Sequence, residues 1–163
     1  MANKYPRCIV FGIGNPDRGD DAAGPAVARQ LREPLLRGVK IIEHGGEATA
    51  LVAQMAARSI FLIDACASGA PPGTIHRFDA SAAPLPDLAF GLSTHGCGVA
   101  MAVELARTLG QLPRRCIIYA IEGASFAIGA PLSPPVVAGI AEVVDRVRAE
   151  IGSCANEGGR RHA

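Results

Sequence analysis

The sequence contains no tryptophan, and aromatic residues make up only 4% of its 163 residues. A core that is poor in large rings must be built from Ala, Val, Ile and Leu, and hydrophobic residues at 49% of the chain are enough for one. An excess of charge is also missing, because 16 basic residues face 15 acidic ones. This balance excludes the basic footprint of a nucleic-acid-binding protein and the polybasic patch of a membrane-surface protein.

Long apolar runs and paired cysteines are absent too. No run approaches the roughly 20 residues that a membrane-spanning helix needs. The N-terminal residues lead into a short apolar stretch and lack the longer apolar region and cleavage site of a signal peptide. The five cysteines are widely spaced and form no CxxC pair, which favours free thiols over a disulfide framework. We therefore expect a cytoplasmic monomer with no membrane partner and no nucleic-acid partner.

Short apolar runs alternate with helical patterns along the chain. The apolar runs predict five strands, at residues 8–11, 39–43, 59–64, 74–78 and 116–121. Four segments predict helices, at residues 22–36, 48–57, 98–109 and 136–151. Residues 80–93 are rich in Ala, Pro and Gly and predict a long loop.

This order of elements predicts an α/β fold. We expect a three-layer sandwich, in which an open, twisted, mostly parallel sheet of about five strands carries helices on both faces. One domain should cover residues 1–151, and the polar, Gly-rich residues 152–163 should form a disordered tail. In such sheets the active site lies outside the carboxyl ends of the strands, so the polar residues at those ends are the candidates for function.

Asp64 is the clearest candidate, because it directly follows a strand that is expected to be fully buried. A carboxylate beside an apolar core is costly unless a partner stabilises it. Asp20 and Asp21 open the first predicted helix, and we assign the N-cap to Asp20, so that Asp21 is left to point back over the sheet. For all three residues, capping or a buried hydrogen bond is the structural alternative.

His95 precedes the helix that is predicted from residue 98. The positive end of a helix disfavours the imidazolium, so this imidazole is expected to be neutral, the form that binds a metal or accepts a proton. Two carboxylates and one imidazole suit Ni, Zn, Mn or Fe, and three protein ligands leave positions open for a substrate. The sequence thus predicts a divalent metal site at Asp21, Asp64 and His95.

Other motifs are weaker. The glycines of the first loop match only half of the dinucleotide-binding pattern GxGxxG, since Asp17 replaces the third glycine and the acidic loop would repel a pyrophosphate. The sequence has no GxSxG elbow and no P-loop. A thiol hydrolase that uses Cys97 or Cys66 is an alternative, although a Cys close to a His in sequence is weak evidence. His76, inside a predicted edge strand, is expected at the surface.

The candidate residues lie within segments that resemble the hydrogenase maturation endopeptidases, which remove the C-terminal extension of the large subunit of nickel–iron hydrogenases. The resemblance covers roughly residues 8 to 150. It rests on Gly12-Ile13-Gly14-Asn15, Gly19-Asp20-Asp21-Ala22-Ala23-Gly24, Gly45-Gly46, Phe61-Leu62-Ile63-Asp64-Ala65, Ser93-Thr94-His95 and Ile121-Glu122-Gly123.

The resemblance implies that Asp21, Asp64 and His95 are the catalytic and metal-contacting residues of an aspartic-type or metal-dependent peptidase. It implies that the nickel is carried by the substrate, the hydrogenase large-subunit precursor, although other divalent metals are expected to bind in vitro. Asn15, His44 and Glu122 are expected to contact the substrate. Many relatives have Asp at the position of His44, so His44 is equally a candidate extra ligand or the mark of a subgroup with a different partner. A non-enzymatic nickel-binding assembly factor or chaperone, and a peptidase acting on another pro-segment, are the alternatives.

Overall fold

The computed structural model describes residues 5–34, 36–87 and 98–159, with side chains described as far as Ser153. Its sheet has the strand order β2-β1-β3-β5-β4, in which all neighbours are parallel except β4, the antiparallel edge strand. The strands are β1 (Cys8–Ile13), β2 (Val39–His44), β3 (Ser59–Cys66), β4 (Ile75–Asp79) and β5 (Arg115–Glu122). The mostly parallel five-stranded sheet and the edge position of β4 confirm the predicted architecture.

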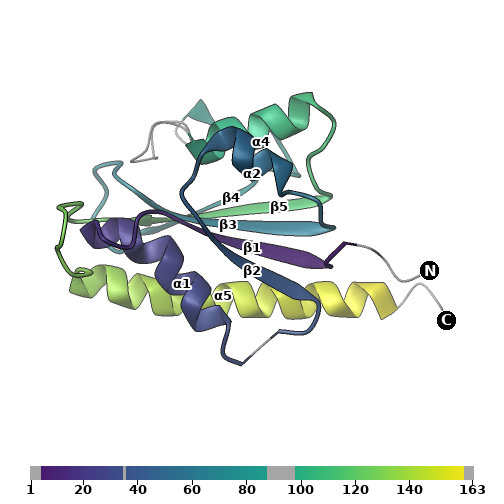
Figure 1. Ribbon diagram of the computed structural model, residues 1–163. Coiled ribbons are helices and arrows are strands. Elements are labelled where there is room, and N and C mark those ends of the chain that lie inside the picture. Colours follow the sequence, from purple (N-terminus) through teal and green to yellow (C-terminus); the bar gives the residue numbers. More distant parts are fainter. Residues whose placement is uncertain (1–4, 35, 88–97, 160–163) are drawn as a thin grey trace.

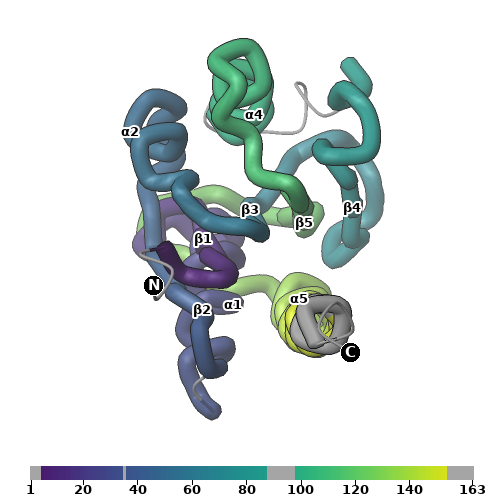
Figure 2. Tube along the Cα trace, turned by 90° about the vertical axis from the view of Figure 1, so that its right-hand side faces the viewer, coloured from purple at the N-terminus to yellow at the C-terminus, as the bar shows by residue number. Residues whose placement is uncertain are grey.

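Helices cover both faces of this sheet, as Figures 1 and 2 show: α1 and α5 lie on one face, and α2 and α4 lie on the other. The helices are α1 (Ala23–Leu31), α2 (Ala48–Ala53), α4 (Gly98–Thr108) and α5 (Pro134–Gly159), and a short 3-10 helix η1 (Gly19–Ala22) precedes α1. None of the helices in the described part of the chain combines the length and the apolar character that crossing a membrane requires.

Strand β3 forms the middle of the core because all of its residues are buried. Successive side chains of a strand point to opposite faces of the sheet. Phe61 and Ile63 accordingly pack with the cluster under α1 and α5, whereas Ile60 and Leu62 pack with the cluster under α2 and α4. This double burial explains why the sequence of β3 is a continuous apolar run with no polar alternation.

Three predicted helix ends were wrong. Helix α1 ends at Leu31 and not near residue 36, because Pro34 disfavours helical geometry in the residue before it and supplies no backbone N–H. Helix α2 ends at Ala53, short of residue 57.

Helix α5 instead continues to Gly159, so residues 152–159 are helical where a disordered tail was expected. Once a helix is formed, each added residue gains a backbone hydrogen bond at little further cost. Residues 80–86 are irregular, as predicted, and the rest of the predicted loop up to residue 93 lies mostly outside the described residues.

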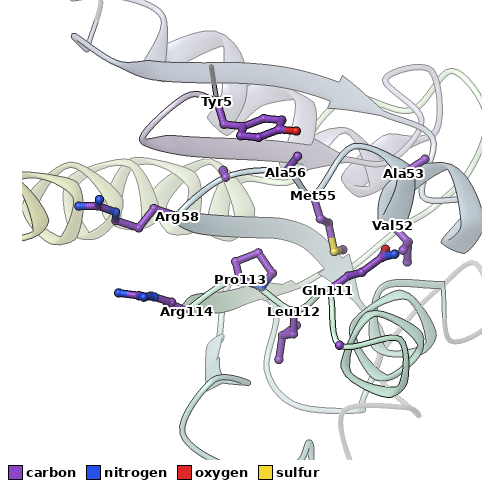
Figure 3. A pocket seen from close by; sticks show the side chains of 12 residues that line it. Tyr5, Val52, Ala53, Met55, Ala56, Arg58, Gln111, Leu112, Pro113 and Arg114 are labelled. Carbon is purple, nitrogen blue, oxygen red and sulfur yellow. The ribbon is translucent and has the colours of Figure 1, made fainter. Parts of the chain in front are cut away.

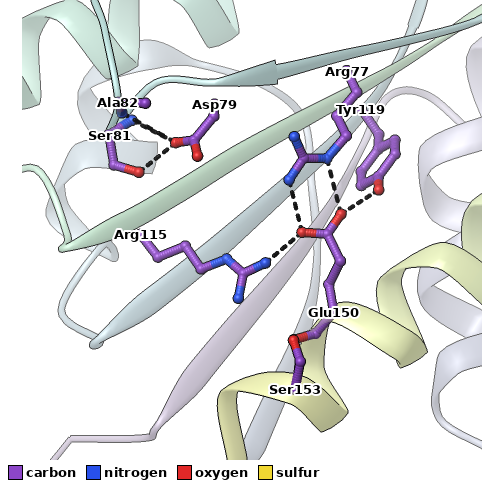
Figure 4. Close-up of polar contacts among 8 residues, drawn as sticks. All are labelled: Arg77, Asp79, Ser81, Ala82, Arg115, Tyr119, Glu150 and Ser153. Carbon is purple, nitrogen blue, oxygen red and sulfur yellow. Dashed lines mark hydrogen bonds and ion pairs between the residues drawn. The ribbon is translucent and has the colours of Figure 1, made fainter. Parts of the chain in front are cut away.

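Helix α5 is fixed to the sheet by one carboxylate. Figure 4 shows Glu150 receiving hydrogen bonds from Arg77 on β4 and from Arg115 and Tyr119 on β5. The two bonds from Arg77 form a fork of 2.9 and 2.8 Å, the geometry in which a guanidinium binds a carboxylate most strongly. This contact ties the edge strand β4 to the helix beneath the sheet.

Candidate active site at the carboxyl ends of the strands

The strand order reverses at β1, which pairs with β2 on one side and with β3 on the other. In open parallel sheets the two chain connections at such a switch point run in opposite directions. They form a crevice between them at the carboxyl ends of the strands, and ligands bind in this crevice. Asp21 follows β1, and Asp64 lies near the end of β3. The topology therefore brings these two acidic residues to either side of the same crevice.

Asp21 lies in η1, where a tight loop from β1 surrounds it. The residue is fully buried, and its Oδ2 accepts a hydrogen bond from the backbone N–H of Asn15 at 2.9 Å. Gly14 approaches it so closely that a Cβ at that position would lie 2.0 Å from the Asp21 carbonyl oxygen, and its φ of +138° strains any other residue. The glycines of the GxGN motif therefore shape the loop around this carboxylate.

The Asp64 carboxyl is 5% exposed, and its Oδ1 accepts a hydrogen bond from the backbone N–H of Ala65 at 2.8 Å. Burial, with a smaller effect of Asp21 in the same direction, raises the pKa of this carboxyl to about 8 against the opposing hydrogen bond from Ala65. A carboxyl with this pKa is largely protonated at neutral pH.

Asp20 does not cap the first helix, contrary to the prediction. Neither η1 nor α1 has a side-chain cap hydrogen bond. The buried Asp20 carboxylate instead accepts hydrogen bonds from the loop after β5, from the N–H groups of Ala124 and Ser125 and from the N–H and hydroxyl of Ser133. Burial opposes ionisation, but these hydrogen bonds hold the pKa of Asp20 below its usual value. The sequence gives no local sign of a partner more than a hundred positions away.

His44 ends β2, beside the loop of Asp21. Its Nδ1 accepts a hydrogen bond from the N–H of Gly46 at 2.9 Å, so the proton of the neutral ring lies on Nε2. Burial lowers the pKa of His44, and Glu47 opposes this effect. The Gly14 N–H donates to the His44 carbonyl, which fixes the end of β2 against the loop. Asn15 is exposed at the same edge, and the roles of His44 and Asn15 in substrate binding stay predictions.

His95, the third predicted ligand, lies outside the described residues, as do Ser93 and Thr94. The described chain resumes at Gly98, three positions later, as the first residue of α4. A Cβ on Gly98 would lie 2.5 Å from the Gly46 carbonyl oxygen, so α4 begins against the loop that follows β2. Helix α4 thus begins at the end of the sheet where β2 finishes, the end near which Asp64 lies.

Glu122 ends β5 and is 2% exposed. Its carboxylate accepts hydrogen bonds from the N–H and hydroxyl of Ser68, the N–H of Gly69 and the thiol of Cys66. These donors fix the loop after β3. Substrate contact at Glu122 stays a prediction, and its carboxylate is already surrounded by protein donors.

Cys66 is no candidate nucleophile in this arrangement. Burial is the first of several effects that raise the pKa of its thiol, and the thiol proton is donated to Glu122. A reactive cysteine needs the opposite environment, one that stabilises the thiolate. The thiol-hydrolase alternative at Cys66 therefore has no support, and Cys97 lies outside the described residues.

A pocket of about 670 Å³ lies at the other end of the sheet (Figure 3). Its lining includes Arg58, which precedes β3, and Arg114, which precedes β5. It therefore opens at the amino ends of these strands, away from Asp21 and Asp64, and is not part of the candidate active site.

The family model described as HycI, hydrogenase maturation protease, matches residues 25–150. The chain belongs to the hydrogenase maturation protease family. It is 26% identical over 120 residues to the hydrogenase expression/formation protein HupD of Thiocapsa roseopersicina. That match covers 72% of this chain and 54% of HupD, so the chain spans about half the length of this curated relative.

Solved structures of hydrogenase maturation proteases share the fold of this chain. The hydrogenase maturating endopeptidase HybD from E. coli superposes with a TM-score of 0.77 at 25% identity, over 90% of this chain and 93% of HybD. The [NiFe] hydrogenase maturation protease HybD from Thermococcus kodakarensis superposes with a TM-score of 0.67 at 22% identity, over 88% of this chain and 97% of that one. The second likeness supports the fold alone, which agrees with the α/β architecture predicted from the sequence.

Proposed function

We propose that this chain is an endopeptidase that removes the C-terminal extension of a nickel–iron hydrogenase large-subunit precursor after nickel insertion. The observation that carries the proposal is the pair of buried carboxylates, Asp21 and Asp64, at the switch point of the sheet. Membership of the hydrogenase maturation protease family supports the reaction class. The printed name of the E. coli relative, a maturating endopeptidase, supports it as well.

Nickel enters this proposal as part of the substrate. The carboxylates of Asp21 and Asp64, joined by the imidazole of His95, supply oxygen and nitrogen ligands that suit a borderline divalent cation. As an open half-site they recognise a precursor that already carries its metal, and they hold the scissile peptide beside them. Positioning alone contributes roughly 7–11 kcal/mol to lowering a barrier in well-oriented reactions.

We assign proton transfer to Asp64, a buried carboxyl near the end of β3 whose pKa is raised by burial. A bound cation favours the carboxylate, so docking of the precursor releases the Asp64 proton to solvent and leaves a base beside the substrate. That base accepts a proton from the water that attacks the scissile carbonyl, and returns it to the leaving amine as the C–N bond breaks. Asp21, fully buried in the loop after β1, supplies the second oxygen ligand of the half-site.

The test is cleavage of a purified nickel-loaded precursor, read by the mass of the large subunit. Asp21→Asn, Asp64→Asn and His95→Ala should each reduce the cleavage rate by about a thousandfold or more, while circular dichroism shows a native fold. Glu142→Gln, which alters an exposed carboxylate on α5, is the control and should cleave normally. A nickel-free precursor should not be cut.

Two results would overturn the proposal. Normal cleavage by all three variants would remove the carboxylate site from the reaction. A precursor whose mass stays unchanged with the wild-type chain, while nickel still passes between the two proteins, would indicate the assembly factor or chaperone instead. Monomeric state and cytoplasmic location stay predictions.

A further inference from the structure

A second cluster of potential metal ligands lies on three neighbouring strands. Cys66 on β3 and Glu122 on β5 are directly paired in the sheet, and His76 on β4 pairs with Ala120, two positions before Glu122. Because side chains alternate along a strand, this register puts all three on the same face. Their ligand atoms, one from each residue, all lie within 4.8 Å of one another.

The Nε2 atom of His76 is the ligand atom of the cluster that lacks a hydrogen bond. The side chain of His76 is 20% exposed, contrary to the expectation of a surface residue, and its Nε2 atom is buried without a hydrogen bond among the described residues. It lies 3.5 Å from Oε2 of Glu122, and the Cys66 sulfur lies 3.2 Å from the same oxygen. Buried polar atoms are rarely left unpaired, so this nitrogen points to an occupant that the protein itself does not supply.

We infer that Cys66, His76 and Glu122 form a site for a borderline divalent cation, with Zn²⁺ as the natural occupant. In a tetrahedral zinc site with Zn–S of about 2.3 Å and Zn–N or Zn–O of about 2.0–2.2 Å, ligand atoms lie roughly 3.3–3.6 Å apart. The distances of 3.2 and 3.5 Å around Glu122 are close to this spacing, and the ligand atoms of the cluster all lie within 4.8 Å of one another. Water takes the fourth position.

The proton balance is simple. Metal binding breaks the S–H bond of Cys66 and forms a metal–sulfur bond, and the proton goes to solvent, while His76 binds as the neutral imidazole and Glu122 as the carboxylate. Ser68 and Gly69, which donate to Glu122, orient that carboxylate from behind. A bound ion would join the edge strand β4 to β3 and β5 at the point where the loop of residues 66–69 leaves the sheet.

The thiolate distinguishes this site from the site of Asp21, Asp64 and His95, which has no sulfur ligand. Co²⁺ bound by a thiolate gives a sulfur-to-cobalt charge-transfer band in the near-ultraviolet, whereas Co²⁺ on oxygen and nitrogen ligands does not. The full chain should therefore show this band on titration with Co²⁺, release one proton for each cobalt bound there, and lose the band when Zn²⁺ is added. The inference does not depend on the peptidase proposal, because Asp21→Asn and Asp64→Asn should retain the band.

The variants that test it are conservative. Cys66→Ser should abolish the band, and His76→Gln or Glu122→Gln should weaken cobalt binding by about tenfold or more. The controls Cys97→Ser and Cys154→Ser should keep the band. In an Asp64→Asn background, Zn²⁺ should raise the Tm of the chain but not that of its Cys66→Ser variant, with folding checked by circular dichroism. No band in the full chain, or a band that survives Cys66→Ser, would overturn the inference and leave only the contact between His76 and Glu122.

Discussion

Ser133 donates two hydrogen bonds to the Asp20 carboxylate, one from its backbone N–H at 2.7 Å and one from its hydroxyl at 2.6 Å. The N–H groups of Ala124 and Ser125 add bonds of 2.7 and 3.0 Å to the same carboxylate. Asp20 therefore fixes the loop after β5 to the loop after β1, whereas its neighbour Asp21 accepts a hydrogen bond from the backbone N–H of Asn15. We expect the two adjacent aspartates to have separate roles, Asp20 in stability and Asp21 in the proposed catalysis.

The first prediction separates these tasks by substitution. Asp20→Asn should lower the free energy of unfolding by about 1–3 kcal/mol. The substitution replaces one carboxylate oxygen, which accepts hydrogen bonds, with an NH₂ group, which cannot accept them from the same N–H and O–H donors. Asp21→Asn should change stability far less but stop cleavage of the precursor. Urea unfolding and the cleavage assay, run on both variants, measure the two effects. Equal loss of stability in the two variants would contradict this division.

The second prediction concerns pH and Asp64. The pKa of this carboxyl is about 8 in the folded protein and near 3.8 in an unfolded chain. Between these values the folded protein holds a proton that the unfolded chain has released, so the free energy of unfolding falls as pH rises from about 4 to about 8 and is level above that. Asp64→Asn removes this dependence. Measured with a chelator present, its Tm should match the wild type near pH 4 and exceed it by roughly 5 °C or more near pH 9.

A wild-type Tm that stays parallel to that of Asp64→Asn across this range would contradict the raised pKa. The buried Asp64 carboxyl is expected to destabilise the fold at neutral and alkaline pH, and such a cost is typical of residues that are retained for function.

The third prediction uses two helical glycines. Gly24 in α1 lies against β1 and β3: a Cβ there would lie 2.2 Å from the Ile13 carbonyl oxygen and 2.6 Å from that of Ile63. At Gly152 in α5 a Cβ would meet nothing within 4 Å. Gly24→Ala should therefore destabilise the chain by several kcal/mol and cost activity, since α1 follows directly on Asp21. Gly152→Ala should stabilise it by about 0.5–1 kcal/mol.

Thermal unfolding of the two variants measures this contrast. Equal effects would show that helix propensity alone governs both positions. The contrast also explains why Gly24, the second glycine of the GDDAAG segment, is needed next to the candidate site. Only a residue without a side chain lets α1 begin this close to the ends of β1 and β3.

Much of the fold could be predicted because its signals are local. The buried strands are continuous apolar runs, and Asp64 could be found because its charge interrupts one of them. The partners of Asp20 and the His76–Glu122 contact could not be found this way, because they depend on register between strands and on loops that meet only in three dimensions. Alternation along β3 does offer a faint signal for Cys66, which lies two positions after Asp64 on the same face.

The helix ends were the least predictable part of the fold. The predicted α1 continued to residue 36 although proline geometry opposes a helix through Glu33 and Pro34. The opposite error at α5 arose because residues 152–163 are polar and Gly-rich, a composition that predicted a disordered tail. Glycine within a helix costs only about 1 kcal/mol, which neighbouring turns readily offset.

The last prediction concerns Glu150, which joins α5 to the sheet (Figure 4). Burial opposes its ionisation, but hydrogen bonds from Arg77, Tyr119 and Arg115 outweigh burial and hold the pKa of Glu150 at about 2, below its ordinary value of 4.5. A lowered carboxyl pKa adds stability that is complete above about pH 4.5 and is lost as pH falls toward 2. Glu150→Gln should therefore lower the free energy of unfolding by about 1–3 kcal/mol at pH 7, an amount reduced for the 18% exposure of the side chain.

In urea unfolding series the difference between Glu150→Gln and the wild type should stay constant from pH 7 to about pH 5 and then shrink as the pH falls to 3. Glu142→Gln is the matched control on the same helix, because its partner Arg146 is exposed and such pairs contribute little. Its difference from the wild type should stay near zero at every pH. A gap for Glu150→Gln that does not narrow with acid would mean that packing of the side chain, and not its charge, joins α5 to β4 and β5.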